Sequence, residues 1–136
     1  MVSDSICASL AKQAAEARNN AYAPYSKFKV GAAVLGTDGN VYTGCNIENV
    51  SYGLTMCAER TAIYKMVSSG CTKFVAIAVS AGENPTDSAP CGACRQVMRD
   101  FGDKERMIVL SARTPEDYQE NTLDELLPFS FGPESL

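Results

Sequence analysis

Apolar residues recur at helical spacing near the start of the chain, among lysine, glutamine, glutamate and arginine residues. Four of them share one stripe of a helix surface: Ile6, Leu10, Ala14 and Ala17. A stripe of this kind is typical of an amphipathic helix that packs one face against a core. Pro24, in the segment YAPYS, interrupts the pattern. The pattern predicts a helix over residues 5–21.

The segment that follows, KFKVGAAVLGTDGNVYTGCNI, alternates apolar with other residues over short runs. Alternation places four side chains on one face of a strand: Phe28, Val30, Ala32 and Val34. The sequence TDGN between the two runs is typical of a tight turn. These features predict a β-hairpin.

Helical and strand patterns then alternate. The segments are a helix from CAERTAIYKMVSSG that stops near Gly70, a strand from KFVAIAVSA, a helix from CGACRQVMRDFG, a strand from RMIVLSA and a short helix from TLDELLP capped by Thr122. The nearly continuous apolar run of KFVAIAVSA indicates a strand covered on both faces. Strands that alternate with helices predict a layered α/β domain with a partly parallel sheet. Both Cys-containing motifs then lie at helix N-termini, near the carboxyl ends of strands.

Length and charge narrow the possible functions. The 136 residues suit one domain spanning 1–136. The net charge of −4 argues against a nucleic-acid backbone as the main partner. The first twenty residues lack the basic and apolar regions of a signal peptide, and no apolar run is long enough to span a membrane. We therefore expect a cytoplasmic protein with no membrane partner.

The chain contains no histidine. This absence excludes Ser-His-Asp and Cys-His catalysis and removes the usual acid–base group at neutral pH. A metal site would have to use thiolate, carboxylate or backbone ligands. In a reducing cytosol the six cysteines are expected to be free, catalytic or metal-bound: Cys7, Cys45, Cys57, Cys71, Cys91 and Cys94.

Cys91 and Cys94 have the spacing of two thiolates that bind one ion. A redox pair and two cysteines buried for packing are the alternative interpretations. A third thiol, Cys57, opens another predicted helix, and a redox pair has no use for it. Three thiolates suit zinc and leave a fourth position open for water, as in catalytic zinc sites.

Glu59 is the candidate general base for that water. It lies two residues after Cys57, which in mid-helix would turn the two side chains about 200° apart. Both can face one ion only if Cys57 lies at or before the helix start. The alternative is a glutamate that merely stabilises the helix dipole. Arg60 and Arg95 are candidates to offset the thiolate charge, with an exposed helix face as the alternative.

The pattern C-A-E followed by P-C-x-x-C resembles that of zinc-dependent nucleoside and nucleobase deaminases. The segments AYAPYSKFKVGAAV, GCNIENVSY, CAERTA, PCGACRQV and LLPFSF resemble the small homotetrameric cytidine deaminases over nearly the whole chain. The resemblance implies a three-layer α-β-α fold with a mixed sheet of about five strands.

The resemblance also implies roles for individual residues. It implies one Zn²⁺ per subunit on Cys57, Cys91 and Cys94, with Glu59 as proton shuttle. It implies a substrate-binding set of Phe28, Asn46, Glu48, Ala58 and Phe131, in which Asn46 and Glu48 bind the sugar hydroxyls and Phe28 lies beside the pyrimidine. It implies that Arg60 and Arg95 hydrogen-bond the zinc thiolates, and that Phe131 reaches a neighbouring subunit's site. Phe129 is a second aromatic candidate for that position.

The implied activity is hydrolytic deamination of cytidine and 2′-deoxycytidine to the uridines in pyrimidine salvage, with zinc-bound hydroxide as nucleophile and release of ammonia. One alternative is a deaminase of a modified cytosine nucleoside antibiotic. A polynucleotide deaminase is another, disfavoured by charge. A third, from a different class, is a non-enzymatic zinc module whose fourth ligand would come from Cys45, Cys7 or Cys71, of which Cys45 is the best placed.

Overall fold

A single five-stranded sheet organises the computed structural model, which describes residues 2–103 and 106–136. The strands are β1 (Gly31–Gly36), β2 (Val41–Cys45), β3 (Phe74–Ser80), β4 (Ile108–Ala112) and β5 (Tyr118–Thr122), and their spatial order is β2-β1-β3-β4-β5. Only the β3–β4 pair is parallel, and the other pairs are antiparallel. The sheet is therefore mixed, as predicted.

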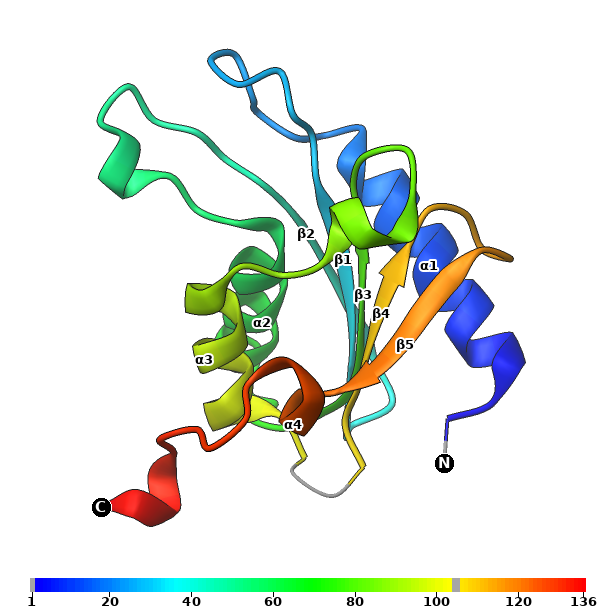
Figure 1. Ribbon diagram of the computed structural model, residues 1–136, viewed down its shortest axis with the longest axis vertical. Coiled ribbons are helices and arrows are strands. Elements are labelled where there is room, and N and C mark those ends of the chain that lie inside the picture. The colour runs from blue at the N-terminus through cyan, green and yellow to red at the C-terminus, as the bar shows by residue number, and fades with distance from the viewer. Residues whose placement is uncertain (1, 104–105) are drawn as a thin grey trace.

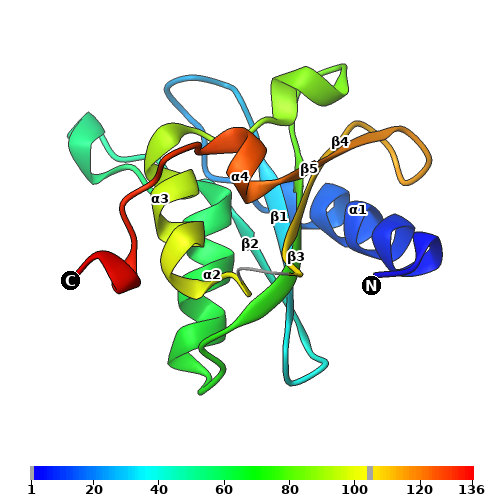
Figure 2. The same cartoon turned by 60° about the horizontal axis from the view of Figure 1, so that its bottom comes forward.

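Helices cover both faces of the sheet. The helices are α1 (Asp4–Arg18), α2 (Ala58–Ser68), α3 (Gly92–Phe101) and α4 (Leu123–Leu126). Helix α1 packs on one face, and α2 and α3 lie side by side on the other (Figures 1 and 2). Alternate strand residues serve the two cores: Ala32 and Val34 face α2 and α3, whereas Ala33 faces α1. The predicted three-layer α-β-α architecture is confirmed.

Helix α1 forms as predicted but ends three residues earlier, at Arg18. The Ser3 side chain caps it by accepting a hydrogen bond from the Ile6 amide. Its buried stripe is displaced from the predicted one and consists of Cys7, Leu10, Ala11 and Ala14, whereas Ile6 is 41% exposed. Small side chains at two of these positions let the helix approach β1 closely. An alanine Cβ at Gly31 would lie 2.0 Å from the Ala14 carbonyl oxygen.

The predicted hairpin is confirmed as β1 and β2, with its turn at residues 37–40. Its first strand begins only at Gly31, so Phe28 lies outside the sheet and is 46% exposed. The alternating pattern nevertheless persists, because Val30 packs against the same core as Val34. Phe28 is thus not a core residue of the strand.

Strand β5 was absent from the sequence prediction. Its sequence YQENT has no apolar alternation, and its residues are half-buried or exposed. It forms because β4 has a free edge, along which Val109 pairs with Asn121 and Ile108 pairs with Thr122. Thr122 then caps α4, as predicted, by accepting a hydrogen bond from the Glu125 amide.

Helices α2 and α3 begin near the same end of the sheet, where β3 finishes (Figure 1). Gly44 of β2 lets α2 lie close, because a Cβ there would be 2.5 Å from the Ala62 amide nitrogen. Gly70, at φ +103°, follows α2 in a left-handed conformation that favours glycine. Within the described part of the chain, no helix combines the length and apolar character that a membrane span requires.

Candidate active site

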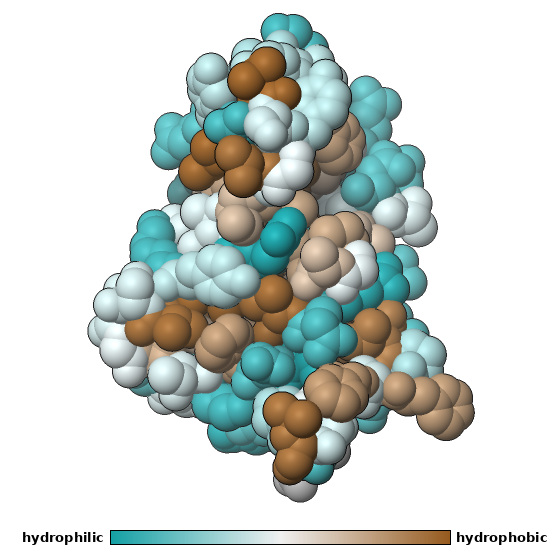
Figure 3. Space-filling model, turned by 90° about the vertical axis from the view of Figure 1, so that its left-hand side faces the viewer, coloured by the Kyte–Doolittle hydropathy of each residue, from teal (hydrophilic) through white to brown (hydrophobic). Residues whose placement is uncertain are grey.

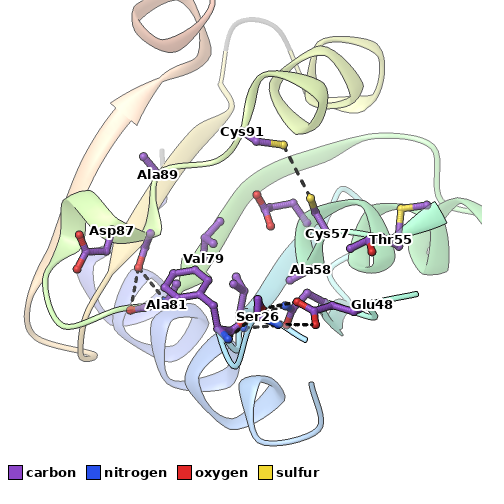
Figure 4. A pocket seen from close by; sticks show the side chains of 16 residues that line it. Ser26, Glu48, Thr55, Cys57, Ala58, Val79, Ala81, Asp87, Ala89 and Cys91 are labelled. Atoms are coloured by element: carbon purple, nitrogen blue, oxygen red, sulfur yellow. Dashed lines mark hydrogen bonds between the residues drawn. The ribbon is translucent and has the colours of Figure 1, made fainter. Parts of the chain in front are cut away.

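Three thiols from two helices meet at one point. Cys57 is the N-cap of α2 and Cys91 is the N-cap of α3, while Cys94 lies in the first turn of α3. Their sulfur atoms all lie within 4.8 Å of one another, and the Cys57 and Cys91 Sγ atoms are 3.8 Å apart (Figure 4). Two thiolates on one tetrahedral zinc, each at about 2.3 Å, would be about 3.8 Å apart. The spacing of this thiol cluster fits zinc.

Glu59 points to the same region because Cys57 lies outside the helix. The Cys57 backbone is extended, with φ −74° and ψ 154°, and α2 begins at Ala58. The sequence prediction that the helix starts at this residue is confirmed. Glu59 lies in the first helical turn and is only 4% exposed. Burial, together with the neighbouring Cys57 charge, raises the pKa of this carboxyl group to about 6.

The pKa values of Cys57 and Cys94 shift in opposite directions. The pKa of Cys57 falls to about 5, because the Cys94 thiol hydrogen-bonds to it and because Arg60 stabilises the thiolate. The same hydrogen bond to Cys57, with burial, raises the pKa of Cys94. A bound divalent cation would replace the shared proton, since metal binding to thiols releases protons.

The two candidate arginines behave differently. Nη2 of Arg60 donates to Cys57 Sγ at 3.4 Å, and this contact raises the pKa of the guanidinium group. Arg95 instead donates from Nε to the Pro90 carbonyl and from Nη1 to the Leu126 carbonyl, both at 2.7 Å. The thiolate contact expected of Arg95 is not among its hydrogen bonds. Arg95 joins the segment before Cys91 to the end of α4.

A cavity of about 280 Å³ opens beside the thiol cluster. The predicted site residues that line it are Phe28, Asn46, Glu48, Cys57, Ala58, Glu59 and Cys91. Its volume is near the lower end of the range for small-ligand pockets, about 300–1,000 Å³. The structure thus brings two of the thiols, a buried carboxylate and four candidate substrate contacts to one cavity.

Asn46 and Glu48 enter the cavity from the segment after β2. Asn46 is 8% exposed, accepts a hydrogen bond from the Val30 amide at 2.9 Å and donates one to the Phe28 carbonyl at 2.8 Å. An amide side chain has two donor hydrogens and two acceptor lone pairs, so one of each remains for a ligand. Glu48 accepts hydrogen bonds from the Ser26 hydroxyl and from the amides of Tyr25 and Ser26. Sequence reasoning missed Ser26, whose only signal is its place in YAPYS.

Phe131 is not brought to this cavity. It is 60% exposed and lines a different hollow with Gln96, whose Nε2 donates to the Phe131 carbonyl at 2.9 Å. Phe129 is fully exposed and has a positive φ of 53°. Both aromatic side chains are therefore available to another molecule.

The cysteines considered as a fourth ligand lie elsewhere. Cys7 is buried between α1 and the sheet, and the Cys71 thiol donates to the Lys73 carbonyl. Among the described residues, the thiol group that fits a metal does not include Cys45. These positions disfavour a closed four-thiolate site and hence a purely structural zinc module.

Comparisons with known proteins agree with this geometry. Residues 5–111 match the family model for the cytidine and deoxycytidylate deaminase zinc-binding region. The cytidine deaminase of Sporosarcina psychrophila is 48% identical over 128 residues, covering 93% of this chain and 92% of that protein. That of Halalkalibacterium halodurans is 50% identical over 127 residues, covering 93% of this chain and 95% of that protein. The crystal structure of cytidine deaminase from Burkholderia pseudomallei is 46% identical, with a TM-score of 0.83 over 90% of this chain and 97% of that one.

Proposed function

This chain belongs to the cytidine and deoxycytidylate deaminase family, and we propose that it hydrolyses cytidine and 2′-deoxycytidine to uridine and 2′-deoxyuridine, with release of ammonia. It is a zinc-dependent hydrolase that acts on the C–N bond of a cyclic amidine. The observation that supports the proposal most directly is the cluster of three thiols next to the buried Glu59, at a cavity of about 280 Å³ that Glu59, Cys57 and Cys91 line.

Cys57, Cys91 and Cys94 would hold the zinc, with one ion per subunit. When bound, zinc supplies a coordinated water whose pKa is lowered toward about 7 and which can act as nucleophile at neutral pH. The N-termini of α2 and α3 favour anionic thiolates at these positions. Arg60 offsets part of the excess negative charge of three thiolates, because its guanidinium group contacts Cys57 directly.

Glu59 is the proton shuttle in this mechanism. Its carboxylate takes a proton from the attacking water and delivers it to ring N3 while the water oxygen bonds to C4. It then takes the second proton of that oxygen and delivers it to the exocyclic amino group, which leaves as ammonia as the C4 carbonyl forms. A buried carboxyl group whose pKa is raised to about 6 can both accept and donate a proton near neutral pH.

The remaining cavity residues bind and orient the nucleoside. The free donor and acceptor of Asn46 and a free lone pair of Glu48 match the hydroxyl groups of a sugar. Phe28, partly exposed at the cavity, provides an aromatic ring for contact with the base. Ala58, at the first position of α2, provides a small wall beside the reacting carbon.

The oligomeric proposal is a homotetramer in which neighbouring subunits complete each site through Phe131 or Phe129. Apolar side chains gather on the face formed by the loop after β2, α3 and the C-terminal segment (Figure 3). Those at least 60% exposed in the chain include Val50, Tyr52, Leu54, Phe129, Phe131 and Leu136. Light scattering gives the assembly mass, and mixing a Glu59→Gln chain with a Phe131→Ala chain tests whether sites are shared. Recovery of activity in the mixture would support sharing, and a strictly additive result would oppose it.

The cellular role we propose is pyrimidine salvage in the cytoplasm. None of the six cysteines forms a disulfide, which supports a reducing compartment. The function itself is tested by following the ultraviolet absorbance of cytidine and the release of ammonia, before and after removal of zinc with a strong chelator. We expect loss of both signals on chelation and their recovery on adding back one zinc per chain. Zinc-loaded protein that leaves cytidine unchanged would refute the function.

A further inference from the structure

The loop of residues 25–27, before β1, connects two residues that line the cavity and lie far apart in the chain, Phe28 and Glu48. The Ser26 hydroxyl donates to Glu48 Oε2, while the amides of Tyr25 and Ser26 donate to Glu48 Oε1 at 3.0 and 3.1 Å. The same hydroxyl oxygen accepts a hydrogen bond from the Phe28 amide at 3.0 Å. One side chain thus holds both the carboxylate and the aromatic residue, as Figure 4 shows for Ser26 and Glu48.

The backbone between Ser26 and Phe28 adopts an unusual conformation. Lys27 has a φ of 61°, a left-handed geometry that few residues other than glycine adopt. This reversal brings the Phe28 amide back to the Ser26 hydroxyl, and the Lys27 side chain stays exposed. Such conformations persist where the surrounding contacts determine them, and they concentrate at ligand sites. The loop is therefore held by its contacts with Glu48 rather than by local preference.

The contacts fix how Glu48 can meet a ligand. A carboxylate offers about four lone-pair directions. Three are used by the loop, two by amides and one by the hydroxyl. The Ser26 hydrogen bond, followed by those of the amides, lowers the pKa of Glu48, so the group is an anion with one direction still free. Its side chain does not need to be ordered when a sugar hydroxyl arrives, which reduces the entropic cost of binding.

We propose that Ser26 is a positioning residue that sets sugar selectivity, by holding Glu48 ready to accept a hydrogen bond from a sugar hydroxyl of the nucleoside. The inference rests on the proposed function, because it takes a nucleoside as the ligand of the cavity. Ser26 acts through Glu48 and takes no part in the proton transfers.

The first experiment compares cytidine with 2′,3′-dideoxycytidine, which has no 2′ or 3′ hydroxyl for Glu48 to contact. Ser26→Ala removes the hydroxyl donor that orients the Glu48 carboxylate toward the sugar, and it is expected to lower kcat/KM for cytidine at least about 10-fold. For the dideoxynucleoside the loss is expected to stay below about threefold, since only the Phe28 contact is affected. Ser26→Thr, which keeps the hydroxyl, is expected to retain the selectivity of the natural chain.

Ser68→Ala is the matched control, because the Ser68 hydroxyl is exposed and donates only to the Lys65 carbonyl, away from the cavity. It is expected to change neither substrate. Equal losses of Ser26→Ala on the two substrates would overturn the proposal, and so would failure of Ser26→Thr to preserve the difference between them.

A second measurement separates this inference from the proposed function. Uridine and 2′,3′-dideoxyuridine have no amino group to lose, so their binding to the zinc-loaded protein reports on the sugar contact without turnover. Ser26→Ala is expected to weaken uridine binding about 10-fold and to leave dideoxyuridine binding within about threefold. Inactivity of the natural chain on cytidine would refute the proposed function, whereas loss of this binding difference would refute the role of Ser26.

Discussion

Replacing Glu59 by glutamine is the most direct test of the proton shuttle. Glutamine has the size of glutamate and can accept or donate hydrogen bonds, but it does not exchange protons near neutral pH. Glu59 is only 4% exposed, so water has little access to replace it. Glu48 also lines the cavity, but its carboxylate is engaged by three donors of the Tyr25–Ser26 segment. Asp87, the other carboxylate that lines the cavity, accepts hydrogen bonds from the amides of Glu83 and Asn84. Neither of these carboxylates is placed as Glu59 is, buried beside the thiols.

The expected loss follows from what one acid–base group contributes to the slowest step. A positioned acid–base group contributes about 10²–10⁴-fold to the rate. Glu59 serves both the protonation of ring N3 and the departure of ammonia, and the slower of the two steps limits turnover, so the expected loss is about 10²–10⁴-fold. This corresponds to about 2.7–5.5 kcal/mol of lost transition-state stabilisation. We expect the loss in kcat, because both transfers follow substrate binding.

The assay is the fall in ultraviolet absorbance as cytidine is consumed, with zinc content measured on the same preparation. Glu83→Gln is the control, because Glu83 is exposed and does not line the cavity. It is expected to keep the activity of the natural chain within about twofold, as for most surface substitutions. A folded Glu59→Gln protein with one zinc per chain and activity within about 10-fold of the natural chain would refute the shuttle.

Three further predictions concern stability and zinc. Gly44→Ala would place a Cβ 2.5 Å from the backbone of α2. It is therefore expected to lower the free energy of unfolding by about 1–3 kcal/mol in urea titrations. Gly53→Ala is the control: open space surrounds Gly53, so this substitution should change the free energy of unfolding by less than about 0.5 kcal/mol. Equal effects of the two would contradict the packing argument. Cys91→Ser should fold, because the position is exposed. Its zinc affinity, measured by competition with a chelator, should fall more than about 100-fold, because replacing even a residue that only hydrogen-bonds to a metal ligand lowers metal affinity about 10–100-fold. Unchanged affinity would remove Cys91 from the ligand set. The Tyr42 hydroxyl donates a hydrogen bond to the Asp38 carboxylate and lowers its pKa. This hydrogen bond therefore stabilises the fold at pH values above the ordinary pKa of an aspartate, and the stabilisation is lost as the pH falls through the lowered pKa of Asp38. Tyr42→Phe should therefore reduce stability at pH 7 and make the urea midpoint less dependent on pH between about 5 and 3, and an unchanged pH profile would argue against it.

Local patterns were sufficient to predict most elements and the three cysteines of the thiol cluster. The helices, the hairpin and two further strands follow from apolar periodicity, and Thr122 and Gly70 lie where their capping preferences place them. Glu59 lies two residues after Cys57, and both side chains can face one ion only if α2 begins after Cys57, as it does at Ala58. These features were predictable because they depend on residues a few positions apart, whose geometry the backbone itself constrains.

Other features depend on partners far along the chain. Strand β5 has no apolar alternation and exists because β4 offers an unpaired edge. Arg95 was expected beside the thiolates, yet it binds the carbonyls of Pro90 and Leu126, the second of which comes from α4. The burial stripe of α1 also differs from the predicted one, because the approach to Gly31 sets which side of the helix faces the sheet.

The sequence by itself determined the chemistry of this protein: three cysteines and one glutamate, in the absence of histidine, at the starts of two helices. The tertiary structure decided how the rest of the cavity is arranged. In the folded chain Phe28 lies outside the strand and is partly exposed, and Glu48 accepts hydrogen bonds from the Tyr25 amide and from the amide and hydroxyl of Ser26, 22 residues away. The physical reason is that spacing along a helix is set by covalent geometry, whereas the partner of a loop carboxylate is chosen only when distant segments pack together.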